Sequence, residues 1–352
     1  MIDPAIAFAM AEQAFQAANA RPGPEAYFRI AGKVMALKFA DAALATKLLP
    51  AFAHLEALEQ TTADLTICCW NDFSNGVEMP EWTGDAGVHG LQYIDGPVRM
   101  AWEIEQRSLQ AYDPNRRLAL FYTPNVSELA TWEQGAPFRQ ILHWWSAGLL
   151  GLQLVHAAAV GTEEGGVLLI GRSGAGKSTQ ALACVGSQLG YAADDYCLLE
   201  LAPAPRVHSL YGSGKANEAS IAMLPRLAEA FRASPIDQQG KSIIFIAEHA
   251  PEAMLRSFPL RAIVLPEIVS GSSCRAEVLS TGEALRAVAP STLLQLPGDR
   301  AQSLARLSSL VRRLPCWRLY VGNNPRAAQP ILEAIIASEA TQESLSAMKP
   351  AS

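Results

Sequence analysis

The segment GRSGAGKS at residues 171–178 constrains this chain more than any other feature. Its spacing is that of a phosphate loop, G-x-x-x-x-G-K-[ST], whose glycines let consecutive backbone N–H groups turn inward around phosphate oxygens. The apolar run 167–170 before it predicts a buried strand, and the helix-forming residues 178–185 after it predict a helix. Strand, loop and helix in this order favour nucleotide binding. A purely structural glycine-rich turn is the alternative.

Each position of this loop has an expected contact with the nucleotide. Lys177 supplies a positive charge to the outer phosphates, and the hydroxyl of Ser178 is an expected ligand of Mg²⁺. The nucleotide-binding residues predicted here are Gly171, Arg172, Ser173, Gly174, Ala175, Gly176, Lys177, Ser178 and Thr179. The motif therefore predicts a nucleoside triphosphate and Mg²⁺ as cofactors. We take the nucleotide to be ATP, although the motif does not distinguish ATP from GTP.

The composition indicates about two globular domains in 352 residues. Half of the residues are hydrophobic and 18% are charged, so the chain can bury a sizeable core. Residues 1–150 carry 10 basic and 17 acidic residues, whereas residues 151–352 carry 18 and 17. Because no basic stripe is present, nucleic acid is not an expected partner. The near-neutral second half is compatible with binding a polyanionic nucleotide.

The cysteines and the apolar segments bear on the compartment. Six cysteines show neither a C-x-x-C pair nor a regular spacing, so we expect reduced, buried thiols, as in a cytoplasmic protein. The N-terminus carries Asp3 and no basic segment before an apolar one, so no signal peptide is expected. The most apolar window, 141–160, is interrupted by His143, Gln153 and His156, which favours a core helix running into a strand over a membrane span.

The overall fold expected is α/β within an α+β whole, in two domains. Residues 1–140 are predicted to form a smaller α+β domain that serves substrate recognition or regulation. Its expected elements are a helix at 4–20, strands at 33–39, 65–70 and 118–122, and a broken helix at 42–58. The strand 33–39 is expected to be half-buried, because Met35, Leu37 and Phe39 share one face. A helix over 137–150 is expected to lead into the second domain, residues 141–345.

The second domain alternates strands and turns and ends in helices. The strands are expected at 154–160, 166–170, 191–201, 243–247 and 262–265, and the closing helices at 304–313 and 327–336. The last dozen residues are expected to be a frayed tail.

Asp194 and Asp195 interrupt an otherwise apolar strand pattern, about sixteen residues after Ser178. Two carboxylates in that setting cost several kcal/mol to desolvate unless a cation or donor meets them. A metal-bound nucleotide supplies such a partner. One Asp would hold Mg²⁺, directly or through water, while the other accepts a proton from an incoming hydroxyl. A solvated turn between two strands is the alternative.

Three further residues are candidates near the loop. His156 lies on the strand before the loop strand, so its imidazole reaches the mouth of the loop if those two strands pair; a satisfied core histidine is the alternative. Lys215, within YGSGKAN at 211–217, and Lys241, next to Gly240, are expected to present charge to the nucleotide. For each lysine, a solvated surface charge is the alternative. No Ser–His–Asp order or zinc-ligand spacing supports a hydrolase.

Three segments, LVHAAAV (154–160), GGVLLIGRSGAGKST (165–179) and GYAADD (190–195), together resemble the catalytic domain of HPr kinase/phosphorylase and its relatives. APSTLLQLPG (289–298) and LPCWRLYVGNN (314–324) extend the resemblance loosely, towards HPr-kinase-related serine kinases of bacteria. The resemblance implies a phosphate-loop domain with a mixed sheet, related to phosphoenolpyruvate carboxykinase.

Carried over by motif position, the resemblance assigns roles. It implies that Lys177 contacts phosphate, that His156 assists at the acceptor side, and that Asp194 and Asp195 supply the base and a metal contact. The metal contacts expected are Ser178 and Asp195. The implied activity is ATP-dependent transfer of the γ-phosphoryl group to a serine-type hydroxyl on a peptide, a small protein or a serine-like metabolite.

The sequence also departs from that family. Thr179 stands where HPr kinases have an acidic residue, Arg172 replaces the usual Asp, and the family's downstream signature is not recognised. HPr itself is therefore a doubtful acceptor. The alternative function is an NTPase or nucleotide-sensing module without an acceptor. Because the N-terminal region differs from that of the family, its hexamers are not carried over, and a homo-oligomer is left open.

Overall fold

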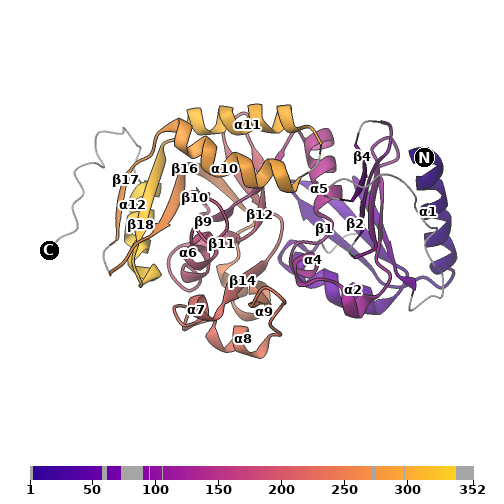
Figure 1. Ribbon diagram of the computed structural model, residues 1–352, viewed down its shortest axis with the longest axis horizontal. Helices are drawn as coiled ribbons and strands as arrows, with labels where there is room; N and C mark the ends of the chain where they lie inside the picture. Colours follow the sequence, from indigo (N-terminus) through magenta and orange to yellow (C-terminus); the bar gives the residue numbers. More distant parts are fainter. Residues whose placement is uncertain are drawn as a thin grey trace. The chain divides into compact units, whose positions relative to one another are not determined.

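The computed structural model describes residues 3–57, 62–72, 90–94, 96–104, 106–271, 274–296 and 298–337. The chain forms two compact units (Figure 1). The N-terminal unit is Met1–Gly151 with Leu296–Gly298, and the C-terminal unit is Leu152–Gln295 with Asp299–Ser352. The boundary falls at Gly151 and not at the predicted residue 140, because helix α5 (Arg139–Trp145) packs on the N-terminal sheet. The predicted tail lies outside the described residues.

The N-terminal unit contains a seven-stranded mixed sheet of order β1-β2-β3-β7-β6-β5-β4. Its strands are β1 (Glu25–Ile30), β2 (Lys33–Phe39), β3 (Leu65–Trp70), β4 (Leu91–Tyr93), β5 (Arg99–Glu103), β6 (Ser108–Asp113) and β7 (Leu118–Tyr122). The pairs β2–β3 and β3–β7 are parallel, and the others are antiparallel. The predictions of strands at 33–39, 65–70 and 118–122 are confirmed by β2, β3 and β7.

Helices cover both faces of this sheet. They are α1 (Pro4–Ala18), α2 (Ala42–Leu48), α4 (Thr131–Gly135) and α5, with 3-10 turns at Leu49–Leu55 and Val126–Glu128 and a π-turn at Ser146–Leu150. On one face, Phe15 of α1 packs on Trp70, with ring centroids 5.9 Å apart. On the other, Phe138 meets Phe121 edge-on at 5.0 Å. Strand β2 is therefore buried on both sides, and the half-buried prediction for it was wrong.

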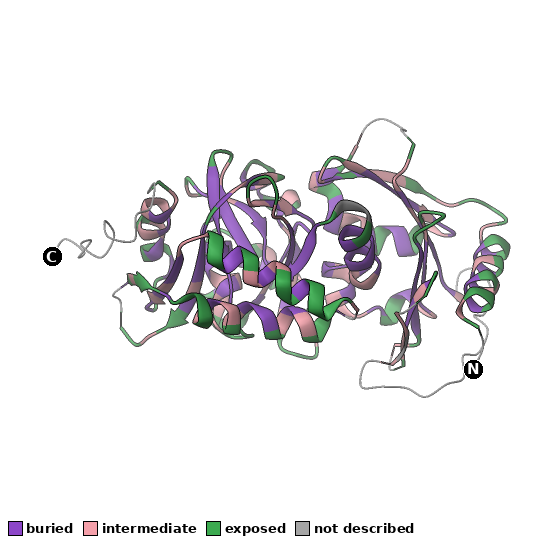
Figure 2. Cartoon of the chain, turned by 90° about the horizontal axis from the view of Figure 1, so that it is seen from above, coloured by how far each residue is buried: buried purple, intermediate pink, exposed green. Residues whose placement is uncertain are grey.

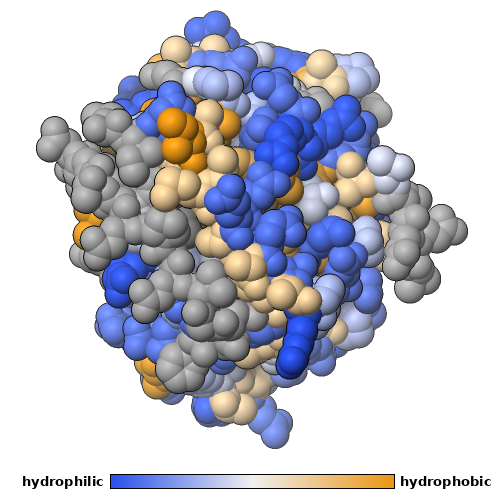
Figure 3. Space-filling view, turned by 90° about the vertical axis from the view of Figure 1, so that its right-hand side faces the viewer, coloured by the Kyte–Doolittle hydropathy of each residue, from blue (hydrophilic) through white to orange (hydrophobic). Residues whose placement is uncertain are grey.

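Helix α1 buries one side against the sheet and leaves its other side on the surface of this unit. Its buried residues are Ala7, Phe8, Ala11, Ala14, Phe15 and Ala18, which recur at helical spacing and face the sheet. On the side that carries α1, hydrophilic residues predominate and apolar ones are scattered among them (Figure 3).

The C-terminal unit contains a nine-stranded mixed sheet with the path β11-β9-β10-β16-β13-β12-β8, to which β18 adds beside β16 and β17 beside β18. The strands are β8 (Gln153–His156), β9 (Ala158–Thr162), β10 (Gly165–Leu169), β11 (Gly190–Ala193), β12 (Tyr196–Glu200), β13 (Arg206–Ser209), β16 (Ser257–Ile268), β17 (Arg275–Val278) and β18 (Cys316–Val321). A separate ribbon pairs β14 (Ser213–Asn217) with β15 (Lys241–Phe245). Parallel pairs join β16 to β10 and β18, so the predicted mixed sheet is confirmed.

The long strand β16 connects the two parts of this sheet. Its first residues pair antiparallel with β13, as in Phe258 opposite Val207. Its later residues pair in parallel with β10 on one side and β18 on the other, as in Ile263 opposite Leu168 and Cys316. One continuous strand therefore links the strand that precedes the glycine-rich loop to the β13–β12–β8 part of the sheet.

Helices also cover both faces of the C-terminal sheet (Figures 1 and 2). The helices are α6 (Lys177–Ala183), α7 (Glu218–Ile221), α8 (Ala228–Ala233), α9 (Ile246–His249), α10 (Thr281–Gln295), α11 (Arg300–Arg313) and α12 (Gln329–Ala337), with 3-10 turns at Pro251–Ala253 and Pro325–Ala328. Val167 and Leu169 of β10 face α6 and α12, whereas Leu168 and Ile170 face α10 and α11. The run 167–170 is continuously apolar because each face has its own core.

Two predicted strands are each broken in the structure. The expected strand 154–160 divides at Ala157 into β8 and β9, and the expected strand 191–201 divides at Asp194 and Asp195 into β11 and β12. Consequently β9 pairs with the loop strand β10, whereas β8, which carries His156, pairs with β12. The expected strand 243–247 also ends early, because α9 begins at Ile246.

Two further predictions concern the cysteines and the membrane. All six cysteines are buried and free, as predicted. Within the described parts of the chain, no helix is both long enough and apolar enough to cross a bilayer.

Candidate functional site

The glycine-rich loop, residues 171–178, lies between β10 and α6. Gly174 and Gly176 have φ of 82° and 95°, values that would strain any residue with a side chain. Among the described residues, no carbonyl accepts a hydrogen bond from the main-chain N–H of Ser173, Gly174 or Gly176. These donors are therefore available to an anion.

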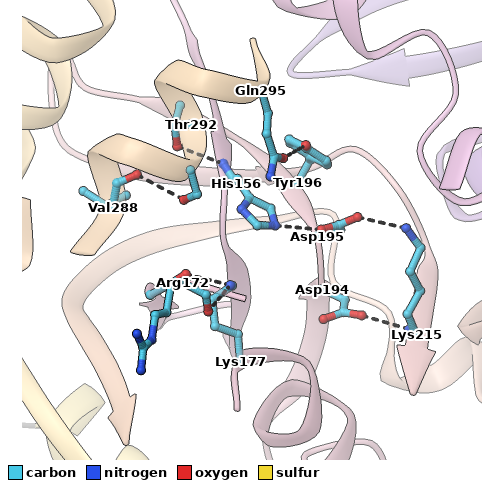
Figure 4. Close-up of polar contacts among 12 residues, drawn as sticks. His156, Arg172, Lys177, Asp194, Asp195, Tyr196, Lys215, Val288, Thr292 and Gln295 are labelled. Carbon is cyan, nitrogen blue, oxygen red and sulfur yellow. Dashed lines mark hydrogen bonds and ion pairs between the residues drawn. The ribbon is translucent and has the colours of Figure 1, made fainter. Parts of the chain in front are cut away.

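Lys177 is the first residue of α6 and is buried, with 6% of its surface exposed. Its Nζ donates hydrogen bonds to the carbonyl oxygens of Gly171 at 2.8 Å and Arg172 at 3.4 Å (Figure 4). Burial lowers the pKa of this ammonium, and the carboxylates of Asp194 and Asp195 oppose that shift. The lysine is thus a desolvated cation close to both acids, a setting that strengthens its attraction for phosphate.

Asp194 lies at the junction of β11 and β12 and is 3% exposed, so the solvated-turn alternative fails for it. Its Oδ2 accepts a hydrogen bond of 2.9 Å from the main-chain N–H of Lys215. Its Oδ1 is buried and finds no hydrogen-bond partner among the residues described. Burial and the charge of Asp195 raise the pKa of Asp194, while the nearby Ser178 hydroxyl lowers it. This acid therefore has one oxygen available for a further ligand.

Asp195 has both carboxylate oxygens occupied. Its Oδ1 lies 2.9 Å from Nε2 of His156, and its Oδ2 accepts a 3.0 Å hydrogen bond from Nζ of Lys215 (Figure 4). Burial alone would raise the pKa of Asp195, but the charge of Lys215 and the hydrogen bond from His156 hold it well below its ordinary value. The adjacent acids are therefore driven in opposite directions, Asp195 towards the ionised form and Asp194 towards the neutral one.

His156 reaches the site from β8, where it lies opposite Tyr196 in the β8–β12 pair. Its ring centroid is 5.2 Å from that of Tyr196, and its main-chain N–H donates to Oγ1 of Thr292 on α10 at 3.2 Å. The Tyr196 hydroxyl in turn donates to the side chain of Gln295. The imidazole is held between the sheet and α10, with Nε2 turned towards the acid pair, so it is more than a core residue.

These groups line one cleft of about 510 Å³. It brings together Ser173, Gly174, Ala175, Gly176, Lys177, Ser178, Thr179, both acids, His156, Lys215 and Lys241. Gly171 and Arg172 instead line a neighbouring cavity of about 940 Å³, and the Arg172 side chain is exposed and points away from the acids (Figure 4). Three lysines against two aspartates give the cleft a positive balance, which suits a polyphosphate.

Several residues at this site were not predicted from the sequence. Ser220 lies 3.0 Å from the Thr179 hydroxyl, and Tyr196, Thr292 and Gln295 surround His156. The segment 289–298, which contributed to the resemblance, contains Thr292 and Gln295. It was the one signal available for them, since the sequence gives no reason for α10 to approach β8.

No protein-family model matches this chain, and a search of curated proteins found no match. In the part of the chain that the structure describes, no group of three or more His, Cys, Asp or Glu side chains is arranged to hold a metal ion.

Proposed function

We propose that the C-terminal unit is an ATP-dependent phosphotransferase that moves the γ-phosphoryl group to a serine-type hydroxyl. The single observation that carries the proposal is the shared cleft. The free amides of the glycine-rich loop, the buried Lys177 and the Asp194–Asp195 pair all face the same space of about 510 Å³. Phosphoryl transfer depends on positioning and charge neutralisation, and these groups supply both.

The donor set fits a magnesium ion at Ser178 and Asp194. What supports Asp194 over the expected Asp195 is the buried Oδ1 of Asp194, which has no partner within the described structure, near the Ser178 hydroxyl. Both oxygens of Asp195 are already engaged. A bound Mg²⁺ would neutralise charge on the β- and γ-phosphates as the leaving oxygen departs.

The protein groups then act on either side of the transferred phosphoryl group. The loop amides and Lys177 hold the phosphate oxygens, and the lysine exchanges its carbonyl partners for the nucleotide. An acceptor hydroxyl aimed at Asp195 forms the new O–P bond as the bond from Pγ to the β-phosphate oxygen breaks. Its proton passes to the Asp195 carboxylate, whose oxygens each accept one hydrogen bond and keep a second lone pair, and which His156 orients. The low pKa of Asp195 makes it a weak base, which suffices because a loose transition state needs little proton removal.

The sequence resemblance supports the class of acceptor. The order of a histidine strand, a glycine-rich loop and an acid pair resembles HPr kinase/phosphorylase, so we infer a hydroxyl on a peptide, a small protein or a serine-like metabolite. The departures at Arg172 and Thr179 make HPr a poor candidate. The six buried free thiols support a cytoplasmic location.

Incubation with γ-labelled ATP, Mg²⁺ and an extract of the source cells tests the proposal. We expect label on an acceptor, in a linkage stable to mild acid as a serine phosphate ester is, and no label with the Asp194→Asn variant. Label released only as inorganic phosphate would favour the NTPase alternative. Absence of nucleotide turnover would refute both.

A further inference from the structure

We propose that Lys215 is a positioning residue that fixes the carboxylates of Asp194 and Asp195 against the glycine-rich loop. The sequence predicted a contact between this lysine and the nucleotide. The inference rests on the proposed phosphotransferase function and adds to it the residue that sets the geometry of its acid pair.

The main chain around Lys215 is held from two sides. The hydroxyl of Tyr191, on β11, donates a 2.6 Å hydrogen bond to the carbonyl oxygen of Ser213. A Cβ atom at Gly214 would lie 2.6 Å from Cδ2 of Leu182, so β14 approaches α6 too closely to carry a side chain there unless Leu182 shifts. The segment YGSGKAN therefore brings Lys215 to the acids through packing, and its glycines do not form a second phosphate loop.

Lys215 contacts the two acids through different atoms. Its main-chain N–H donates to Oδ2 of Asp194 at 2.9 Å, and its Nζ donates to Oδ2 of Asp195 at 3.0 Å (Figure 4). Only 14% of its side chain is exposed. One residue thus spans both carboxylates and neutralises part of the repulsion between them.

Lys241 provides the contrast within the same ribbon. It lies on β15 opposite Asn217 and lines the cleft, and no carboxylate of the described chain forms an ion pair with its ammonium. Its charge is available to a phosphate, whereas the charge of Lys215 is committed to Asp195. Because misplacement of a reacting group by about 1 Å can cost about 100-fold in rate, the loss of this clamp should affect turnover more than nucleotide binding.

The Lys215→Met variant, which keeps the main-chain N–H and the stem but removes the ammonium, tests the inference. We expect kcat to fall about 100-fold while the KM for ATP changes less than about threefold. Lys215→Arg, which keeps a cationic donor, should recover at least about a tenth of the wild-type kcat. Arg261→Met is the matched control. This guanidinium is exposed and donates to the carbonyl oxygen of Glu164, away from the residues that line the cleft, so the activity of this variant should be unchanged.

A double-mutant cycle with Asp195→Asn separates positioning through Asp195 from an independent role. If Lys215 acts through Asp195, the double variant should be no slower than Asp195→Asn alone. The inference would be overturned if the losses of kcat in the two single variants multiplied in the double variant. It would also be overturned if Lys215→Met raised the KM for ATP tenfold and left kcat intact. A wild-type protein that binds ATP but labels no acceptor would instead refute the proposed function, and this inference with it.

Discussion

Nε2 of His156 lies 2.9 Å from Oδ1 of Asp195, although the two residues are 39 positions apart in the chain. The β8–β12 pairing explains the proximity, because it places His156 opposite Tyr196, the residue after Asp195. The hydrogen bond links the imidazole to an acid that Lys215 also holds. In the proposed reaction, the histidine would thereby orient the carboxylate that receives the acceptor's proton.

Replacing His156 with alanine should therefore reduce turnover without weakening nucleotide binding. We expect kcat to fall about 100-fold, at the lower end of the usual contribution from a proton-handling group. The dissociation constant for ATP, measured by calorimetry, should stay within about threefold, since the ring contacts the acid and not the loop. A loss of affinity as large as the loss of kcat would place His156 at the nucleotide instead.

Lys177→Met should abolish stabilisation by nucleotide. At an ATP concentration 100 times Kd, the wild-type protein should gain about 2.7 kcal/mol of unfolding free energy, and the variant none. The unfolding midpoint without nucleotide should not fall, because burial already disfavours the charged form of this lysine. Thermal scans with and without Mg²⁺–ATP measure both effects. Full nucleotide stabilisation of the variant would contradict the role of the loop.

Asp194→Asn should stabilise the free protein while eliminating transfer. Burial and the charge of Asp195 raise the pKa of Asp194, so the ionised acid opposes folding at neutral pH. We expect a gain of about 1 kcal/mol near pH 7, the scale of one incompletely satisfied buried group. Near pH 3 the acid is protonated in both folded and unfolded states, so the gain should vanish there. Urea unfolding of the wild type and the variant at the two pH values measures this gain in unfolding free energy. A variant less stable than the wild type at pH 7 would contradict the expectation.

Asp195→Asn should have the opposite effect. Because the folded-state pKa of Asp195 is well below its ordinary value, the acid stabilises the fold above about pH 4, and that contribution is lost as the pH falls through the folded pKa. We expect the variant to lose about 2 kcal/mol near pH 7, the scale for a largely buried donor such as Lys215 that loses its hydrogen-bond partner. The difference in unfolding free energy between the variant and the wild type should become smaller below pH 4. A pH-independent difference between wild type and variant in urea unfolding would argue against the ion pair as its source.

The six cysteines should react slowly with a thiol reagent in the folded protein. Burial raises the pKa of Cys68 and of Cys184 to about 12, so little thiolate forms at neutral pH. We expect fewer than one thiol per chain to react in the time in which denatured protein shows all six. Rapid reaction of the native protein would indicate an exposed thiolate.

The sequence predicted those parts of the fold that depend on local pattern. Residues 65–70 and 118–122 form the expected strands, and the loop follows a buried strand and begins a helix. The break at Ala157 could not be predicted, since it lies in a short apolar run that one strand would also fit. A turn at Asp194–Asp195 was one of the two alternatives, but its burial at Asp194 was not expected. A single strand period fits both runs, and only the sheet order shows that β8 and β9 have different neighbours.

Several residues that line the candidate cleft could be named from the sequence, but their contacts with one another could not. Lys177, His156 and the acid pair were identified from residue type and spacing, and they line one cleft. The sequence could not show that the ammonium of Lys215 forms an ion pair with Asp195, because that contact requires the approach of β14 to α6. Nor could it separate Asp194 from Asp195, whose difference arises from burial and from partners on β8 and β14.

The continuity of β16 bears on how the C-terminal unit loses order. Because this strand pairs with β10 and β18 along one part and with β13 along another, removing it would detach the loop's support and the β12 side together. Amide protons on these strands should then exchange through a single opening reaction. We therefore do not expect a partly unfolded state in which the glycine-rich loop stays ordered while the segment that carries Asp194 and Asp195 is disordered.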